Sequence, residues 1–553
     1  MKLCYIWVEK YKNLEDFELN LCSNTQYCYD HDIATISETE KHSVPKNLFN
    51  EKFSDITAIV GKNSAGKSNS LDLICKILVN NIKSFKNYIF IMEDNNTRYL
   101  YSSLIPDREI INKTKCEINN SPSSIKNLNV VFFSNIYDAN YLPISTFNSR
   151  NNFKFISANN DYNLRSYYRR AKHTTLFKKQ ISFIKNLGRK NLEEIDFDVP
   201  DNIMVGLVFK PVNENFRFYS RVDKNNSTYI KEFDKYISSK LKKIIDRKDI
   251  SSLDKYIECL KISIVHRVID RYVKFNKNDI DRFDVKYENA IEIIENKKFN
   301  KIIDYNKKWN DDLEDDKELE NTLTQIDSLK ESISDNVDIS SMSEFNPRHI
   351  EFRIKFKTSD NLSSHLYEHL ENMISLGFIS VRWEGISSGH NAFLTLFSLI
   401  YDALKGTRAN TIICIDEGDL YLHPKWQIQF FRNIEKILPQ FSSSSSQKLQ
   451  LVLTSHSPFL LTDLPRNNII ILNEGKVVDN DLKTFGANLY DLYDQAFFLD
   501  QEKIGTFAFS KIIEASENIY SSNKDLKNNA KLLIDIIGDD LIRGQLKGMI
   551  NND

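Results

Sequence analysis

Cysteines are few in this sequence and follow no regular spacing. Seven of them lie scattered along 553 residues, and no two form a Cys-x-x-Cys pair. Disulfide frameworks and cysteine zinc sites both show ordered spacing. The pattern therefore favours reduced thiols over either kind of crosslink.

Long apolar runs are also lacking. No stretch approaches the roughly 18 consecutive apolar residues of a transmembrane helix. The N-terminal sequence MKLCYIWVEKYKNLEDF meets an acid at Glu9 and lacks the apolar centre and cleavage site of a signal peptide. We expect no membrane contact and a cytoplasmic location.

An excess of charge of one sign is missing too. The net charge is −2, so any contact with nucleic acid must come from a local patch. Apolar residues make up 41% of the chain and charged residues 27%, as in ordinary globular proteins. Because single cores rarely exceed about 250–300 residues, we expect more than one compact unit.

Apolar periodicity divides the chain into four parts. Residues 1–145 alternate strand-like runs (AIV, YIFIM, NVVFF) with helical ones, which predicts an α/β sheet. Residues 146–346 predict a mainly helical insertion domain, without the sustained heptads of a coiled-coil arm. Strand patterns return in 347–480 (HIEFRIKF, GFISVRW, NTIICID, LQLVLTS), and 481–553 predicts a helical tail.

The segment ITAIVGKNSAGKSNSLDLICKIL carries a complete Walker A motif between an apolar strand and a helix. Backbone N–H groups of such a loop and the helix N-terminus surround phosphate oxygens. Lys67 would neutralise the β- and γ-phosphates, and Ser68 would bind Mg²⁺. The predicted nucleotide-binding residues are Gly61, Lys62, Asn63, Ser64, Ala65, Gly66, Lys67, Ser68 and Asn69.

A second apolar strand, TIICIDE, ends in two acids, as a Walker B element does. A carboxylate at the end of a buried strand is costly without a partner such as a metal. Asp416 is predicted to hold Mg²⁺ and Glu417 to act as the general base.

A third apolar strand, LVLTSHSPFLL, runs into His456. A histidine there can hydrogen-bond a γ-phosphate and sense its loss, so we predict a catalytic sensor role. The alternative is a plain helix cap formed by Ser457 before Pro458, and both can hold together.

Taken in order, GKNSAGKS, ISSGHN, IDEGDLYLHPKWQ and TSHSPFLL, with a long insertion after the first half, resemble an ABC-type ATPase head. The LHPKWQ form is similar to the soluble defence branch rather than to transporter ATPases. The runs FGANLYDLYDQAFFLDQEKIGTFAFSKI and IIGDDLIRGQL resemble the tail of the PtuA-like ATPases of Septu and retron anti-phage systems, relatives of OLD and SMC ATPases. The resemblance implies an α/β P-loop NTPase, a mixed sheet with flanking helices, that binds ATP and Mg²⁺.

In this class two heads meet head to tail, and the signature loop of one closes over the ATP of the other. The resemblance therefore assigns Ser387, Ser388 and Gly389 to the partner's nucleotide, with Ser387 donating to the γ-phosphate and Gly389 permitting close approach. His390 departs from the family pattern, which has Glu or Gln there, and could tune nucleotide affinity or pH response.

The resemblance also implies partners. They are a second copy in a homodimer or higher oligomer, a separately encoded PtuB-like HNH nuclease, and in retron systems a reverse transcriptase with its msDNA and ncRNA. No HNH arrangement is visible among the ten histidines of this chain. Nucleic acid would be met through the complex.

Two further site positions follow from the resemblance. The glutamine-loop position falls in FFSNIYDAN, where Asn135 is the predicted Mg²⁺ or water ligand. An adenine-stacking aromatic is predicted at Tyr11 or Tyr5, with core packing as the alternative.

Two patterns resemble catalytic motifs of other enzymes. Glu474 with Asp479 and Asp481 offers Toprim-type ligands, but their spacing suits a surface hairpin. HLYEH, from His365 to His369, fits an inverted zinc-peptidase pattern, but we assign its neighbouring strands to the ATPase sheet and expect a helix without catalysis.

The stretch LRSYYRRAKHTTLFKKQISFIKNLGRK is basic and free of acids, with interleaved aromatics at Tyr167, Tyr168, Phe177 and Phe183. Cations that grip phosphates beside aromatics that stack on bases predict a nucleic-acid surface, and a solvated helix face is the equal alternative. The cations considered are Arg165, Arg169, Arg170, Lys172, Lys178 and Lys179.

The leading hypothesis is an ATP-hydrolysing subunit of a defence complex that controls a separate HNH nuclease. The alternatives are a self-contained ATP-regulated nuclease acting on RNA or DNA, and an SMC-like DNA-repair ATPase.

Overall fold

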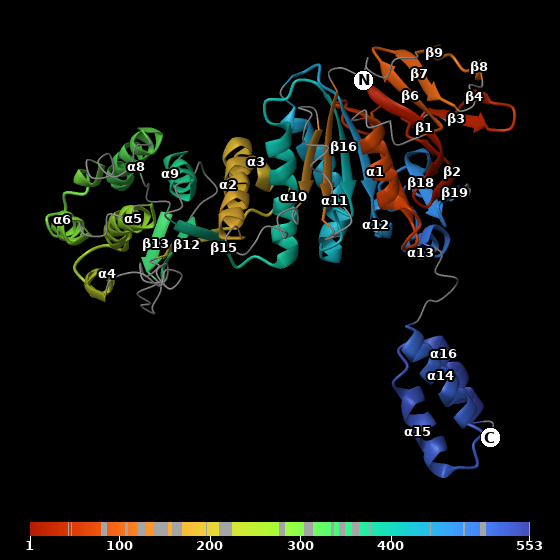
Figure 1. Ribbon diagram of the computed structural model, residues 1–553. Coiled ribbons are helices and arrows are strands. Elements are labelled where there is room, and N and C mark those ends of the chain that lie inside the picture. The colour runs from red at the N-terminus through yellow and green to blue at the C-terminus, as the bar shows by residue number, and fades with distance from the viewer. Residues whose placement is uncertain are drawn as a thin grey trace.

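Figure 1 shows the computed structural model of the chain. It describes residues 1–41, 44–45, 47–78, 86–104, 109–119, 128–135, 153–157, 169–194, 196–208, 224–275, 283–303, 313–332, 337–341, 349–356, 364–375, 379–442, 444–478, 482–497 and 505–551.

A seven-stranded sheet forms the centre of the ATPase part. Its neighbouring strands are parallel, except for an antiparallel hairpin at one edge. Such strands are buried on both faces and read as continuous apolar runs. In spatial order the strands are β11 (Phe153–Ser157), β10 (Leu128–Ser134), β16 (Asn410–Asp416), β17 (Leu449–Thr454), β5 (Phe53–Gly61), β18 (Ile469–Asn473) and β19 (Lys476–Val478).

Helices cover both faces of this sheet. Alternate residues of β16 point to opposite sides: Ile412 and Cys414 join one hydrophobic core, and Ile413 and Ile415 join the other. The first core contains α1 and the second contains α10 and α11, so the sheet lies between α1 and α10 (Figure 1). The helices here are α1 (Lys67–Leu78), α10 (Ser388–Leu404), α11 (Pro424–Ile437) and α12 (Pro458–Thr462), with short 3₁₀ helices η7 (Leu438–Phe441) and η8 (Arg466–Asn468). This α/β P-loop architecture confirms the predicted fold class.

Two smaller sheets form the N-terminal part. Ile6 and Val8 of β1 pack toward α1, while Tyr5 and Trp7 face the other way and meet the three-stranded sheet. The first sheet contains β2 (Leu14–Asn20), β1 (Lys2–Tyr11), β6 (Tyr88–Asp94), β7 (Thr97–Ser103) and β9 (Glu117–Ile118). The second contains β3 (Thr25–Asp30), β4 (Thr35–Glu40) and β8 (Ile111–Lys113). The expected alternation of strands and helices is therefore wrong for this part: α1 is the one helix among its described residues.

The insertion combines helices with a four-stranded antiparallel sheet. Its helices are α2 (Arg169–Leu187), α3 (Arg189–Glu194), α4 (Lys224–Asp246), α5 (Ser252–Phe275), α6 (Phe283–Glu295), α8 (Leu313–Ser332) and α9 (Ser364–Ser375). Its sheet has the order β13 (Val337–Ser341), β14 (His349–Phe356), β12 (Asn202–Val208) and β15 (Ile379–Glu384). We had assigned β14 and β15 to the ATPase sheet, which is incorrect, because both pair with β12. The boundary expected at residue 346 therefore runs through this sheet.

The C-terminal part is helical, as the sequence predicted. Helix α13 (Leu489–Phe497) lies against α12 and β5. The following helices are α14 (Thr506–Asn518), α15 (Lys524–Asp535) and α16 (Asp540–Asn551), and they share a small apolar core of their own. Within the described residues, no helix combines the length and apolar character needed to cross a membrane.

Gly61 ends β5 at a point where another strand approaches closely. Its φ is +147°, and a Cβ there would lie 2.0 Å from the Leu472 carbonyl oxygen of β18. The neighbouring atom is backbone in a paired strand, so it cannot move without breaking the pairing of β5 with β18. Only glycine fits at this start of the phosphate loop.

We predict that Gly61→Ala destabilises the protein far more than Gly406→Ala. Gly406 also has a positive φ, +76°, but nothing lies within 4 Å of its added Cβ. The control should cost roughly 1–2 kcal/mol of backbone strain. Gly61→Ala adds the backbone clash and should cost roughly 3 kcal/mol or more. Urea unfolding midpoints measure the difference, and equal midpoints would show that β18 can shift at little cost.

Candidate nucleotide-binding and hydrolysis site

The predicted phosphate loop joins β5 to α1. Ser64 and Gly66 have positive φ angles of +63° and +101°, which turn the backbone around the loop. The buried Lys67 ammonium donates to the carbonyls of Gly61 at 3.1 Å and Lys62 at 3.0 Å. Burial lowers the pKa of Lys67 to about 8, although the carboxylates of the Walker B segment oppose this shift. The lysine thus lies folded over its own loop.

Asp416 lies at the centre of a set of oxygen atoms. It ends β16 with no exposed surface. One carboxylate oxygen, Oδ1, accepts hydrogen bonds from Ser68 Oγ at 3.1 Å and Thr454 Oγ1 at 2.5 Å. These side chains meet because β16 and β17 pair in parallel with Asp416 opposite Thr454, and β5 follows next in the sheet. An all-oxygen donor set suits a hard cation such as Mg²⁺.

Glu417 and His456 form a contact directly beyond these strand ends. His456 Nε2 lies 3.1 Å from Glu417 Oε1. Glu417 has a φ of +49°, which is uncommon for a residue with a side chain. Its N–H donates to the Thr454 carbonyl at 3.2 Å and to Thr454 Oγ1 at 3.1 Å. The backbone turn therefore aims the carboxylate away from the sheet and toward the histidine.

Asp419 is a buried acid that the sequence analysis missed. Ser455 Oγ donates to its Oδ2 at 2.5 Å, and Ser457 N–H donates in turn to Ser455 Oγ at 2.8 Å. Burial raises the pKa of Asp419 to about 6, while the hydrogen bond from Ser455 opposes the shift. This carboxyl links the segment after β16 to the segment after β17. Its position shortly after the two acids of Asp-Glu-Gly-Asp was the available signal.

Asn135 follows the end of β10 and is buried. Its N–H donates to the Asp416 carbonyl at 3.3 Å, since Ser134 lies opposite Asp416 in the parallel pair. The predicted ligand position is therefore adjacent to the Walker B acid.

The turn between β1 and β2 also reaches the phosphate loop, and the sequence analysis missed it. Asn13 Nδ2 donates to the Ser64 carbonyl at 3.4 Å, and Asn69 Nδ2 donates to Asn13 Oδ1 at 2.6 Å. Lys12 Nζ donates to Asn69 Oδ1 at 3.1 Å. This turn places a cation and an amide beside the start of α1.

Neither predicted adenine-stacking tyrosine presents a ring face to solvent. Tyr5 is fully buried in the core between the two N-terminal sheets. Tyr11 donates to Asp72, accepts from Lys76, and has both Lys12 and Lys76 over its ring, at 5.5 and 4.9 Å from the centroid. Tyr5 therefore packs in the core, which was the alternative to stacking on adenine. Tyr11 contacts Asp72, Lys12 and Lys76 of its own chain.

The signature serines open α10. Ser387 is the N-cap, and its Oγ accepts the His390 N–H at 3.1 Å. Ser387 and Ser388 are exposed, whereas Gly389 is buried, and a Cβ on it would lie 2.7 Å from the Tyr421 carbonyl oxygen. The close approach to Tyr421 thus gives glycine a reason within this chain, and the close approach of a partner's nucleotide stays a prediction.

His390 does not face the signature opening. Its Nε2 lies 2.6 Å from the Asp198 carbonyl oxygen and its Nδ1 3.7 Å from the Asp198 carboxylate, while its ring packs edge-on against Trp426. The His390 imidazole thus connects α10 to the segment before β12. The predicted influence on nucleotide affinity would have to act through the position of α10.

Two of the six cations considered in the basic segment pair within the chain. Lys178 pairs with Glu371 at 3.8 Å and Lys179 with Asp402 at 2.9 Å. Phe177 and Phe183 are buried in the main core, so they cannot stack on bases. Arg165, Tyr167 and Tyr168 lie outside the described residues, and Arg169, Arg170 and Lys172 lie in α2 without described side chains.

Both apparent motifs of other enzymes have structural explanations. Glu474 and Gly475, with φ angles of +48° and +78°, form the turn of the β18–β19 hairpin, as expected; Asp479 and Asp481 lie outside the described residues. His369 is buried, with Nε2 3.1 Å from the Tyr256 hydroxyl, and burial lowers its pKa to about 3. No cluster of three metal-ligating side chains occurs in the part of the chain that the structure describes.

We predict that ATP affinity weakens as the pH rises above about 8. Free Lys67 loses its proton near that pH, whereas a phosphate needs the ammonium form. Since the bound phosphate raises the pKa, affinity should fall up to about tenfold per pH unit above the free pKa. Titration with a fluorescent ATP analogue measures this, with circular dichroism at each pH as the control for folding. Constant affinity to about pH 9.5 would show that the free lysine stays charged.

Comparison with known proteins finds relatives named as an endonuclease, a retron ATPase and a Septu protein. The chain is 24% identical over 276 residues to Endonuclease GajA of Bacillus cereus (strain HuB5-5), covering 45% of this chain and 39% of that protein. It is 36% identical over 84 residues to the Retron Vc95 probable ATPase of Vibrio cholerae serotype O1 biovar El Tor (14% of this chain, 15% of that one). It is 35% identical over 78 residues to Septu protein PtuA of Bacillus thuringiensis (14% and 17%). The chain thus spans less than half the length of each, and the resemblance to Septu and retron ATPases is confirmed.

A family model gives the broadest match. The model described as an AAA ATPase domain matches residues 1–461, which include the phosphate loop, the signature loop, the Walker B acids and His456. This span covers most of the chain and ends before β18 and β19 of the ATPase sheet. The protein therefore belongs to the AAA ATPase domain family.

Proposed function

We propose that this chain binds and hydrolyses ATP as a subunit of an anti-phage defence complex, with the nucleotide held between two heads. The observation that carries the proposal is the meeting of Ser68, Asp416, Glu417 and His456 at one edge of the parallel sheet. The family match supports the ATPase chemistry. The names of the retron and Septu relatives support the defence role.

Phosphate binding falls to the loop between β5 and α1. The N-terminus of α1 directs N–H groups and its positive dipole end toward an anion. Lys67 would exchange the carbonyls of Gly61 and Lys62 for phosphate oxygens. This exchange replaces neutral acceptors with charged ones, which strengthens the hydrogen bonds of the ammonium.

Ser68 and Asp416 would hold Mg²⁺, with Asn135 as a further ligand from the neighbouring strand end. Thr454 fixes the Asp416 carboxylate by its 2.5 Å hydrogen bond. When bound, the ion would neutralise phosphate charge. The burial of Asp416 suits this role, because a buried carboxylate needs cationic or hydrogen-bonding partners.

Glu417 would take the proton from the attacking water as general base. In the free chain His456 holds the Glu417 carboxylate at 3.1 Å. On nucleotide binding His456 would donate to the γ-phosphate instead, which releases the carboxylate for water. The pair thereby links base activity to an occupied site.

The second half of the site would come from another copy. Ser387 and Ser388 are exposed at the N-terminus of α10, a 17-residue helix. Hydroxyls at a helix N-terminus suit an anion. We propose that they close over the γ-phosphate bound by the partner head, so that ATP joins the two heads.

We predict that Glu417→Gln slows ATP hydrolysis by about 10²- to 10⁴-fold, the contribution typical of a general base. ATP binding should persist, because Lys67, Ser68 and Asp416 are unchanged. The trapped nucleotide should then stabilise a dimer, measured by light scattering with and without ATP. Glu517→Gln, an exposed position on α14, is the matched control. A Glu417→Gln variant that binds ATP and stays monomeric at micromolar concentration contradicts the composite site.

In the defence complex this ATPase would control a separately encoded HNH nuclease, and in a retron setting a reverse transcriptase with its msDNA and ncRNA. Nucleic acid would be met through that assembly. Open reading frames beside the gene that encode an HNH protein, with or without a reverse transcriptase, would support this arrangement.

A self-contained nuclease is the second candidate function. It is favoured by the similarity to Endonuclease GajA, which covers 45% of this chain. Against it, the one Toprim-like acid that the structure describes, Glu474, lies in a hairpin turn. An SMC-like ATPase is less favoured, because the longest described helix of the insertion, α5, has 24 residues and spans only about 36 Å.

We predict that the purified chain alone does not cleave RNA or DNA with Mg²⁺ and ATP. Plasmid, single-stranded DNA and total RNA are the substrates, with Mn²⁺ as a second metal. Cleavage that co-purifies with the chain and survives in Glu417→Gln would favour the self-contained nuclease.

A further inference from the structure

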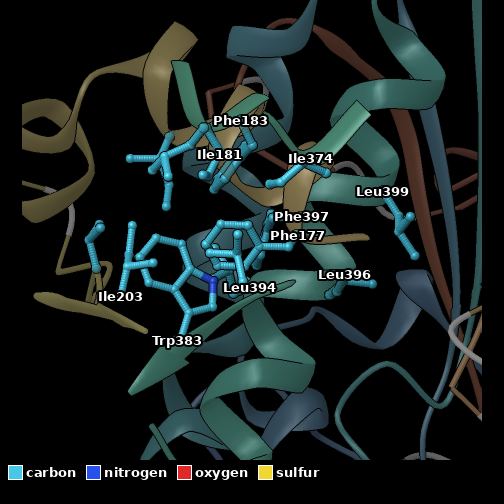
Figure 2. Packing of buried hydrophobic residues seen from close by; sticks show 14 of the residues in the cluster. Phe177, Ile181, Phe183, Ile203, Ile374, Trp383, Leu394, Leu396, Phe397 and Leu399 are labelled. Carbon is cyan, nitrogen blue, oxygen red and sulfur yellow. The ribbon is translucent and has the colours of Figure 1, made fainter. Parts of the chain in front are cut away.

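A single amide lies buried in the apolar core that joins the insertion to the ATPase part. Gln180 of α2 has an exposed fraction of 2%. Phe177 and Ile181 of α2, Trp383 of β15 and Leu394 of α10 belong to this core (Figure 2). Burying an amide costs free energy unless its hydrogen bonds are made, so a glutamine here needs an explanation.

The Gln180 amide is satisfied by three other side chains. Its Oε1 accepts the Trp383 indole N–H at 2.9 Å. Its Nε2 donates to Thr395 Oγ1 at 3.0 Å and to Asn391 Oδ1 at 3.2 Å. Because an indole nitrogen can only donate, the orientation of the amide is fixed.

These partners stand on either side of the signature loop. Trp383 is the penultimate residue of β15, just before the loop, and Asn391 and Thr395 lie on one face of the first turns of α10, just after it. Gln180 therefore joins the two ends of the loop that carries Ser387 and Ser388. Apolar packing alone is non-directional, whereas three hydrogen bonds specify one position of α10 relative to β15.

The bond set also ties the loop to the insertion. Helix α2 packs against α9 and β15 as well as α10. The β15 strand is the edge of the insertion sheet and continues directly into the signature loop. A shift of α2 or of that sheet must therefore either carry the signature serines with it or break these hydrogen bonds.

We propose that Gln180 is a positioning residue that sets the signature serines for the partner's ATP and couples the insertion domain to the ATPase cycle. This inference rests on the proposed composite site. Gln180 acts at a distance from the nucleotide, through Trp383 and Asn391. The bond from His390 to Asp198 anchors the same helix independently, so loss of Gln180 should loosen the loop without unfolding α10.

The test uses the full chain in the Glu417→Gln background. Gln180→Leu should leave ATP binding to the phosphate loop within about twofold, but weaken ATP-driven dimerisation by about tenfold or more, the factor expected from one to two lost hydrogen bonds. In the chain with Glu417 intact, kcat should fall while the KM for ATP changes little. Hydrogen exchange of the amides from 387 to 395 should become faster than in the parent. Asn186→Leu replaces another side-chain amide of α2 by leucine at an exposed position and is the control.

A second variant separates positioning from packing. Gln180→Leu leaves the buried Trp383 N–H without its acceptor, which costs stability by itself. Adding Trp383→Phe removes that donor, so no unpaired N–H remains, and dimerisation should stay as weak as in Gln180→Leu.

Three results would overturn the coupling. The first is full dimerisation of the double variant, and the second is unchanged exchange from 387 to 395 in Gln180→Leu. The third is a Glu417→Gln parent that does not dimerise with ATP. This last result contradicts the composite site itself and is recognised because it appears before any change at Gln180.

Discussion

The parallel register of β5, β17, β16 and β10 is the constraint on which the site depends. Thr454 lies opposite Asp416, and Asp416 lies opposite Ser134, so three strand ends meet at one edge of the sheet. The phosphate loop leaves β5 at the same edge. Residues that are hundreds of positions apart in sequence, such as Ser68 and Asp416, reach hydrogen-bonding distance because the ladder fixes the strand ends in register. Strand pairing, rather than the conformation of the loops, therefore sets the distances between these side chains.

The same edge concentrates buried charge, which the fold must neutralise. Asp416 is stabilised by two hydroxyls, and Asp419 by Ser455. Lys67 is held by carbonyls that cannot match a phosphate, and burial lowers its pKa to about 8. Burial of these groups at one edge therefore carries an electrostatic cost. An anion at the loop and a cation at Asp416 would each relieve a cost that the sheet imposes.

The sequence identified the segments that meet at this site, and the roles of their residues stay predictions. A phosphate loop and a strand ending in Asp-Glu are contiguous, so their spacing carries the chemistry, and the sheet brings them together as expected. The membership of β14 and β15 in the insertion sheet was missed. Burial alternates along both strands, whereas the parallel strands β16 and β17 are continuous buried runs, and this difference was the available signal. Phe177 and Phe183 were predicted to lie on the surface beside the lysines. They are buried, and helical periodicity alone does not reveal which neighbouring element packs on a helix face. The roles of Gln180, Asp419 and Asn13 depend on contacts between distant segments.

The signature loop shows how a capping role and a role at a second copy's nucleotide can be served by one side chain. Ser387 accepts the His390 N–H through an oxygen lone pair, which keeps its hydroxyl proton for donation. Capping therefore fixes the position of Ser387 Oγ, while its hydroxyl proton can still rotate toward an acceptor on another molecule. The position of that oxygen is set from three sides: Gly389 against Tyr421, His390 on Asp198, and Gln180 across the base of the loop. Two of these anchors, Asp198 and Gln180, come from the insertion. In the proposed composite site, a partner that moves the insertion would change ATP hydrolysis without touching the nucleotide.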